Sequence, residues 1–322
     1  MIIKHSKFLS HVTFLNSHFT GKGDISFLCD FTENGNVVFD NTNFSNDGDV
    51  FINARFSGDG NVSFESAQFL GKGDINFRSR FLGKDNVLFN AANFSNGGSV
   101  YFQTNFSNKG DVQFHRTTFS NERNIMFNES NFSNHGNVVF NTASFSNHGS
   151  VQFFKTQFFN EGNVLFNQTN FSNKSVVSFM LTLFHNLKHV SFKRIEFFSE
   201  DYVIFNNAHF SNEGNILFNN AQFFNLGDVQ FSGVQFSKKG SLVFNNARFS
   251  GRGDIFFMSK FNNEGTVDFS DVDFSKEGKV DFTGAEFSGK GFVNFNGAKF
   301  SNLVLFTKCK FLTKVFFSMG LI

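Results

Sequence analysis

The sequence predicts an all-β chain folded as a parallel β-solenoid, and three observations carry this prediction. One short pattern recurs every 12 or 13 residues along the whole chain: Val or Ile, Phe two positions later, a small residue three further on and a second Phe two beyond. Phe supplies 57 of 322 residues, whereas Pro and Trp are absent. Within each unit the alternation has a period of two, which is typical of strands. Because such a unit cannot bury its apolar face alone, residues 1–322 are expected to stack into one solenoid domain.

Each repeat unit divides into two short strands and two corners. In one unit, Val138 and Phe140 are expected to face inward from the first strand, and Ala143 and Phe145 from the second. Two residues separate the strands, and a five-residue segment of the form Ser-Asn-x-Gly-x follows the second one. This segment consists of turn formers, and its Gly reaches positive φ without steric cost. One unit therefore provides two sides and two corners.

One-residue deletions indicate how many units make a full coil. In five units the corner between the two strands is one residue short: Phe27 to Phe31, Ile52 to Phe56, Phe77 to Phe81, Phe102 to Phe106 and Phe257 to Phe261. All five fall on alternate units counted from Ile25, which random placement would produce about one time in sixteen. We therefore predict four-sided coils of about 25–26 residues, with two repeat units per coil. In such a coil, Val164 stacks between Val138 and Val190.

Divided into fives, the strands resemble pentapeptide repeats. Residues 164–168 read Val-Leu-Phe-Asn-Gln and residues 208–212 read Ala-His-Phe-Ser-Asn. The resemblance covers essentially the whole chain and implies a right-handed four-sided parallel β-helix. The chain departs from the family pattern in two ways: alternate sides carry a three-residue insertion such as residues 213–215, and Val replaces the small residue on the other sides. Both departures predict a coil wider than the family's twenty residues.

Stacking predicts ladders of identical side chains inside the solenoid. At a strand spacing of about 4.8 Å, the Phe of one coil lies over the Phe of the next. The small residues at the companion position leave room for these rings. The Asn that follows Ser in the five-residue segment has two interpretations: a second ladder through its amide, or a solvated turn residue.

Composition excludes several classes of partner. The chain has 28 Lys and Arg against 27 Asp and Glu, a net charge of +1, so no nucleic-acid or membrane-surface partner is expected. Cys29 and Cys309 lie near opposite ends of a long stack and are expected to be free thiols. The first residues lack the apolar core of a signal peptide, and no apolar run approaches the ~20 residues of a membrane-spanning helix. A cytoplasmic protein without a membrane span is therefore expected.

A possible partner-binding patch is marked by a weakening of the repeat between Lys174 and Tyr202, where three successive loops lack Gly. Met180 and Leu183 occupy positions that face water in other units. Phe198 and Phe224 are the outward members of doubled aromatics, occupy the same position one coil apart and should touch at the surface. Exposed apolar area often marks an interaction site. The alternative interpretation is drift of a Phe-rich repeat.

No catalytic, cofactor or metal site is predicted, so we expect that the protein is not an enzyme. His185 and His189 lie in a turn without an adjacent Cys or carboxylate, which argues against a metal site. No phosphate loop or nucleotide-binding fingerprint is present. The leading interpretation is a structural or protein-interaction scaffold whose protein partner is unknown.

Two other functions find less support in the sequence. Some pentapeptide-repeat proteins modulate a topoisomerase by mimicking DNA, but such mimicry needs an acidic surface. A surface or autotransporter-like β-helix would need an export signal or clustered carboxylates. The ends of the chain carry a further expectation: the loops from Phe300 to Val304 and from Phe311 to Val315 are short, and residues 315–322 are apolar. Uncapped strand edges associate readily, so we expect either end-to-end homodimers through the C-terminal coil or a chain that is a piece of a longer repeat protein.

Overall fold

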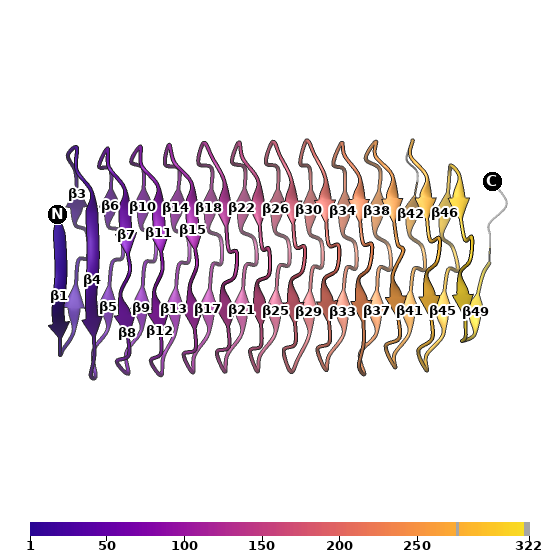
Figure 1. The fold of residues 1–322 in the computed structure, drawn as a ribbon, viewed down its shortest axis with the longest axis horizontal. Helices are drawn as coiled ribbons and strands as arrows, with labels where there is room; N and C mark the ends of the chain where they lie inside the picture. Colours follow the sequence, from indigo (N-terminus) through magenta and orange to yellow (C-terminus); the bar gives the residue numbers. More distant parts are fainter. Residues whose placement is uncertain (275–276, 319–322) are drawn as a thin grey trace.

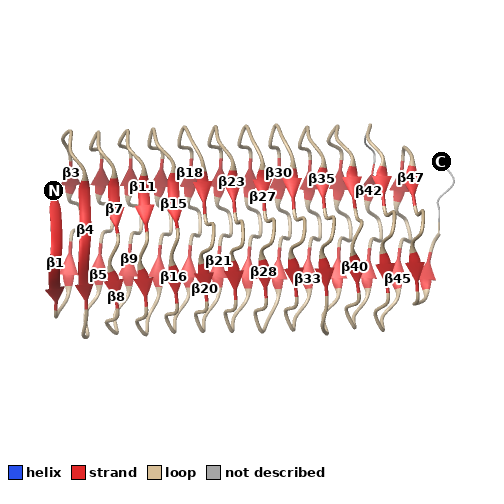
Figure 2. Cartoon of the chain, in the orientation of Figure 1, coloured by secondary structure: helices blue, strands red, loops and turns tan. Residues whose placement is uncertain are grey.

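The computed structural model describes residues 1–274 and 277–318, and it shows a rod of stacked coils (Figures 1 and 2). All regular elements in these ranges are strands. Each coil has four sides, which we number 1 to 4 in chain order. In Figure 1 the strands of sides 3 and 4 run down the near face, those of sides 1 and 2 run up the far face, and the chain advances from left to right. This winding is right-handed, as the resemblance implied.

Sides 1 and 2 are separate parallel sheets. Side 1 comprises β2 (Val12–Thr13), β5 (Val37–Val38), β9 (Val62–Ser63), β13 (Val87–Leu88), β17 (Val112–Gln113), β21 (Val138–Val139), β25 (Val164–Leu165), β29 (Val190–Ser191), β33 (Ile216–Leu217), β37 (Leu242–Val243), β41 (Val267–Asp268), β45 (Val293–Asn294) and β49 (Val315–Phe316). Side 2 comprises β3 (His18–Phe19), β6 (Asn43–Phe44), β10 (Gln68–Phe69), β14 (Asn93–Phe94), β18 (Thr118–Phe119), β22 (Ser144–Phe145), β26 (Asn170–Phe171), β30 (Glu196–Phe197), β34 (Gln222–Phe223), β38 (Arg248–Phe249), β42 (Asp273–Phe274) and β46 (Lys299–Phe300).

Sides 3 and 4 belong to one larger sheet, because β1 (Ile2–Phe8) and β4 (Ile25–Phe31) run through both. Side 3 continues with β7 (Val50–Ile52), β11 (Ile75–Phe77), β15 (Val100–Phe102), β19 (Ile125–Met126), β23 (Val151–Gln152), β27 (Val177–Ser178), β31 (Val203–Ile204), β35 (Val229–Gln230), β39 (Ile255–Phe256), β43 (Val280–Asp281) and β47 (Val304–Leu305). Side 4 continues with β8 (Arg55–Phe56), β12 (Arg80–Phe81), β16 (Asn105–Phe106), β20 (Asn131–Phe132), β24 (Gln157–Phe158), β28 (Leu183–Phe184), β32 (His209–Phe210), β36 (Gln235–Phe236), β40 (Lys260–Phe261), β44 (Glu286–Phe287) and β48 (Lys310–Phe311).

The register confirms a coil of two repeat units. Val164 pairs with Val138 on one side and with Val190 on the other, so neighbours in space lie one full coil, or two units, apart along the chain. Near the beginning of the rod the coil is one residue shorter, as between Ile25 and Val50. The shorter spacing occurs where a coil carries one of the one-residue deletions. The parity of the deletions therefore predicted the coil correctly.

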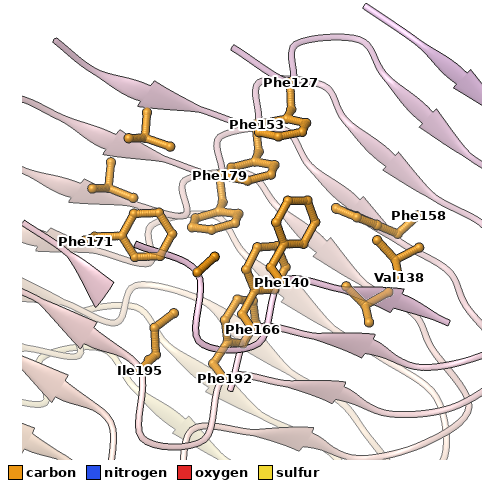
Figure 3. Close-up of a cluster of buried hydrophobic side chains, with 14 of the residues drawn as sticks. Phe127, Val138, Phe140, Phe153, Phe158, Phe166, Phe171, Phe179, Phe192 and Ile195 are labelled. Carbon is orange, nitrogen blue, oxygen red and sulfur yellow. The ribbon is translucent and has the colours of Figure 1, made fainter. Parts of the chain in front are cut away.

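Aromatic ladders fill the interior (Figure 3). On side 3, Phe153 stacks between Phe127 and Phe179 with ring centroids 4.8 Å apart in both directions. On side 1, Phe140 and Phe166 stack at 4.7 Å, and the Phe140 and Phe153 rings meet edge to face at 5.7 Å and 86°. All these side chains are fully buried. Burial of each ring contributes about 1.5–3 kcal/mol, and both packing geometries are favourable for aromatic pairs.

The Asn that follows Ser in the loops forms neither of the two expected arrangements, an amide ladder or a solvated turn residue. In coil after coil it is buried, and its amide group bonds to the backbone rather than to another stacked amide. Nδ2 of Asn147, for example, donates to the carbonyl oxygen of Arg123 one coil away at 2.9 Å and to that of Gly149 at 2.8 Å. Burial of Nδ2 without hydrogen bonds would be costly, so these bonds anchor each loop to the preceding coil, whereas the buried Oδ1 of Asn147 has no partner among the described residues.

A second polar ladder runs along the last position of the loops. The backbone N–H of Asn163 donates to Oδ1 of Asn137 at 2.9 Å, and the backbone N–H of His189 donates to Oδ1 of Asn163 at 3.1 Å. Nδ1 of His189 in turn accepts the N–H of Asn215 at 2.9 Å. The Gly before this position is needed because the coils approach closely: a Cβ on Gly136 would lie 2.6 Å from the carbonyl carbon of Gly110.

The one-residue deletions remove a left-handed residue from the corner between sides 3 and 4. In the long form of this corner, Glu129, Lys155 and Leu181 have φ of 58°, 53° and 57°. No residue of the short corner 78–80 has positive φ. A left-handed conformation turns the chain sharply, so its loss lets the two strands run on in nearly one direction. β4 accordingly extends unbroken from Ile25 to Phe31.

The remaining expectations about the chain are met in part. Cys29 is buried, Cys309 is half-buried and both are free thiols, as predicted. The described residues contain no helix long and apolar enough to cross a membrane. At the C-terminal end, Phe316 and Phe317 are exposed, but Met319–Ile322 of the predicted dimer contact lie outside the described residues. End-to-end association stays a prediction.

Candidate partner-binding surface

The doubled aromatics meet at the corner between sides 2 and 3. Phe198 directly follows β30 and Phe224 directly follows β34, one coil further along the rod. Their ring centroids lie 5.1 Å apart with an interplanar angle of 27°. The Phe198 side chain is 43% exposed and Phe224 is half-buried. The predicted surface contact between the two rings is therefore present.

Two further apolar side chains extend this surface. Tyr202 ends the loop that starts at Phe198, and its side chain is 41% exposed. Leu226 follows Phe224 by two residues and is 50% exposed, and its N–H donates to the carbonyl oxygen of Ser199 at 3.2 Å. The Tyr202 ring lies against the next coil, where a Cβ on Gly227 would come within 2.9 Å of its Cδ1. We call Phe198, Tyr202, Phe224 and Leu226 the aromatic corner.

Acidic groups border the aromatic corner. Glu200 is exposed between Phe198 and Tyr202 in the same loop. The Asp201 carboxylate beside it accepts the backbone N–H of Tyr202 at 2.9 Å. An apolar centre edged by charged groups is the usual anatomy of a protein interface.

Met180 and Leu183 of the predicted patch lie elsewhere. Met180 is in the corner between sides 3 and 4, and Leu183 is in β28 on side 4, whereas the aromatic corner lies at the other edge of side 3. The structure thus groups Phe198, Tyr202 and Phe224 and separates the other two residues from them. Leu226 was missed because a single outward Leu in a variable loop position carries no sequence signal of its own. The one feature of the sequence that indicated Leu226 is its position two residues after the doubled aromatic Phe223–Phe224.

Leu183 lines a shallow groove of about 580 Å³ on side 4 with Phe159, His185 and His209. Nδ1 of His185 lies 2.7 Å from Oγ of Ser211, and Nε2 of His209 lies 3.3 Å from Oγ of Ser237. Burial, together with the nearby His185, lowers the pKa of His209.

The His185 and His189 side chains are both engaged in bonds within the solenoid, to Ser211 and to the N–H of Asn215 respectively. In residues 1–274 and 277–318, no group of three or more His, Cys, Asp or Glu side chains is placed to hold a metal ion. The loops without Gly do not interrupt the solenoid, since Val177, Val190 and Val203 remain fully buried.

No protein-family model matches this chain, and no curated protein matches it. Among solved structures, the chain is similar to the crystal structure of HetL, a pentapeptide repeat protein involved in heterocyst differentiation regulation from the cyanobacterium Nostoc sp. strain PCC 7120. The two share 12% sequence identity over 95% of this chain and 87% of HetL, with a TM-score of 0.18. A superposition this weak carries no argument about function. The coil itself, four-sided, parallel and built from two repeat units, fits a pentapeptide-repeat protein.

Proposed function

We propose that this solenoid is a non-enzymatic scaffold of the cytoplasm that binds a protein partner through the aromatic corner. The observation that supports the proposal is the stacked pair Phe198 and Phe224 at the surface, flanked by Tyr202 and Leu226. Elsewhere along the rod, Ser commonly occupies the position of these two Phe residues, as at Ser146 and Ser172. Aromatic side chains held rigidly at a surface supply most of the binding energy in many interfaces.

The rigidity of the corner favours binding because few conformations are lost when a partner docks. Backbone hydrogen bonds of 2.7 and 2.8 Å tie Phe198 to Phe171 and Phe224 to Phe197 in the preceding coils. The buried ladders beneath fix the spacing of the coils. A partner with an apolar centre and basic groups at its edge would complement Glu200 and Asp201.

DNA mimicry receives less support from the charges of the loops. Some carboxylates on the loops are paired with lysines of neighbouring coils, as in Lys72 with Asp47 at 2.9 Å and Lys290 with Glu264 at 2.8 Å. A surface that imitates a phosphate backbone needs rows of unpaired negative charge. The alternation of signs along this rod works against such a surface.

The test is affinity capture from extracts of the native host with quantitative mass spectrometry. The wild-type chain is compared with the double variant Phe198→Ser and Phe224→Ser, which restores the usual loop residue at both positions. We expect the variant to recover at least tenfold less of a specific partner, since two anchor side chains are lost.

The matched control is Phe159→Ser, which removes a surface aromatic of similar exposure, 41%, from the corner between sides 4 and 1. This variant should capture the partner as the wild type does. Equal recovery of every captured protein by wild type and double variant would refute the aromatic corner as the binding surface. Circular dichroism of all three chains confirms that the fold is retained.

A further inference from the structure

Arginines gather on the sheet face near the beginning of the rod. Three of the chain's eight arginines, Arg55, Arg78 and Arg80, line one shallow groove of about 550 Å³ on sides 3 and 4. All three side chains are exposed. Lys7 and Asp30 also line the groove. The chain as a whole is nearly neutral, so this cluster is a local excess of positive charge.

The short corner explains why the arginines share one face. Arg78 and Arg80 flank Ser79, which is 2% exposed and whose hydroxyl bonds to the carbonyl oxygen of Ile52. Because alternate residues of an extended chain point to opposite faces, both arginines point outward, about 7 Å apart along the chain. Arg55 pairs directly with Arg80 across neighbouring strands β8 and β12. The lateral spacing there is about 4.8 Å.

The three arginines take no part in the ion pairs found in residues 1–274 and 277–318. Among the described residues, ion pairs join lysines and one histidine to carboxylates, but none includes Arg55, Arg78 or Arg80. Like charges directly opposite each other in a sheet are destabilising. Asp30, which pairs with Arg55 on its other side, offsets part of this repulsion, and a bound anion would offset the rest.

We propose that Arg55, Arg78 and Arg80 form a binding site for a phosphate group carried by a larger ligand. A guanidinium presents a planar fork of donors that matches phosphate oxygens, and three of them at these spacings surround one tetrahedral group. The charge of a phosphomonoester, near −2 at neutral pH, is countered by the three arginines.

A carboxylate beside the arginines favours a ligand with donors of its own. The exposed Asp30 carboxylate lines the same groove and lies next to Arg55 in the strand register. It is an acceptor, so hydroxyl or amide donors of the ligand would pair with it. Inorganic phosphate lacks such a donor-bearing frame and should bind more weakly.

The test is isothermal titration calorimetry at low ionic strength with three probes: inorganic phosphate, glucose 6-phosphate and a ten-residue phosphoserine peptide. We expect at least one of the two phosphomonoesters to bind several-fold more tightly than inorganic phosphate, and the tighter one identifies the source of the phosphate. Glucose and the unphosphorylated peptide should not bind. In the double variant Arg55→Gln and Arg80→Gln, the affinity should fall at least tenfold.

The control variant Arg116→Gln and Arg123→Gln removes the same charge from exposed positions outside the groove and should bind as the wild type does. Equal losses in both double variants would show a non-specific effect of charge and overturn the site. Absence of binding of every phosphorylated probe at millimolar concentration would overturn it as well. The affinity for any phosphorylated probe should fall at higher ionic strength, because salt screens exposed charges.

Discussion

Sides 3 and 4 near the beginning of the rod and the same sides in its middle are built from the same repeat, yet they differ by one residue per coil. Where the corner is long, a left-handed residue such as Leu181 turns the chain between two two-residue strands. Where successive coils have the short corner, the side 3 strands are longer, as in β4 and β7, whereas the single short corner at residues 258–260 lies between strands of two residues. The comparison shows that loss of the left-handed residue straightens the corner where neighbouring coils share it, and this face carries the arginine groove.

The difference between the corners is not expected to change the stability of the buried Phe ladders. Substitutions in these ladders should have the largest effect on the free energy of unfolding. Phe77 in the short-corner region and Phe153 in the long-corner region are both fully buried. Replacement of either by Ala should destabilise the protein by about 3–5 kcal/mol, because the ring leaves a cavity that the stacked neighbours cannot fill. Denaturant midpoints measured for Phe77→Ala and Phe153→Ala should agree closely. A much smaller loss for Phe77→Ala would show that the two regions unfold separately.

The corners themselves should respond differently to the same substitution. Leu181 has φ of 57° and Leu28, in a short corner, has no positive φ, although their exposures of 38% and 39% are almost equal. Asn tolerates the left-handed conformation better than Leu, so Leu181→Asn should raise stability by about 0.5–1 kcal/mol. Leu28→Asn lacks this benefit and puts a poor strand former inside β4, so it should lower the thermal midpoint slightly. Equal shifts for both variants would refute strain as the difference between the corners.

The smallest effect concerns pH and the side 4 column that holds His209 in the long-corner region. Burial and the neighbouring His185 lower the pKa of His209 in the folded state. The unfolded chain therefore binds the proton more readily, and stability should fall as the pH drops through the ordinary His range near 6.5. The urea midpoint of His209→Gln should decline less between pH 7.5 and pH 5 than that of the wild type. An identical decline would assign the pH dependence to other groups.

The candidate surfaces were only partly predictable from the sequence. The contact between Phe198 and Phe224 followed from a doubled aromatic at one repeat position and a coil of two repeat units, and the structure confirms it. Met180 and Leu183 were grouped with them because they are near in sequence, but they lie at the other edge of side 3 or beyond it. No pattern in the sequence indicated the arginine groove. Arg55 and Arg80 belong to successive coils and become neighbours only through the register of β8 and β12.

The sequence by itself determined the solenoid, the number of units in a coil and the inward positions, because a strict period leaves each unit no way to bury its Phe residues except by stacking on its neighbours. Tertiary structure decided how the polar positions are used. The Asn after Ser is buried only because a backbone carbonyl of the preceding coil lies at hydrogen-bonding distance, as for Asn147 and Arg123. The surface that an outward side chain helps to form depends on its neighbours a full coil away. Side-chain pairing across coils depends on three-dimensional register, which one repeat unit does not contain.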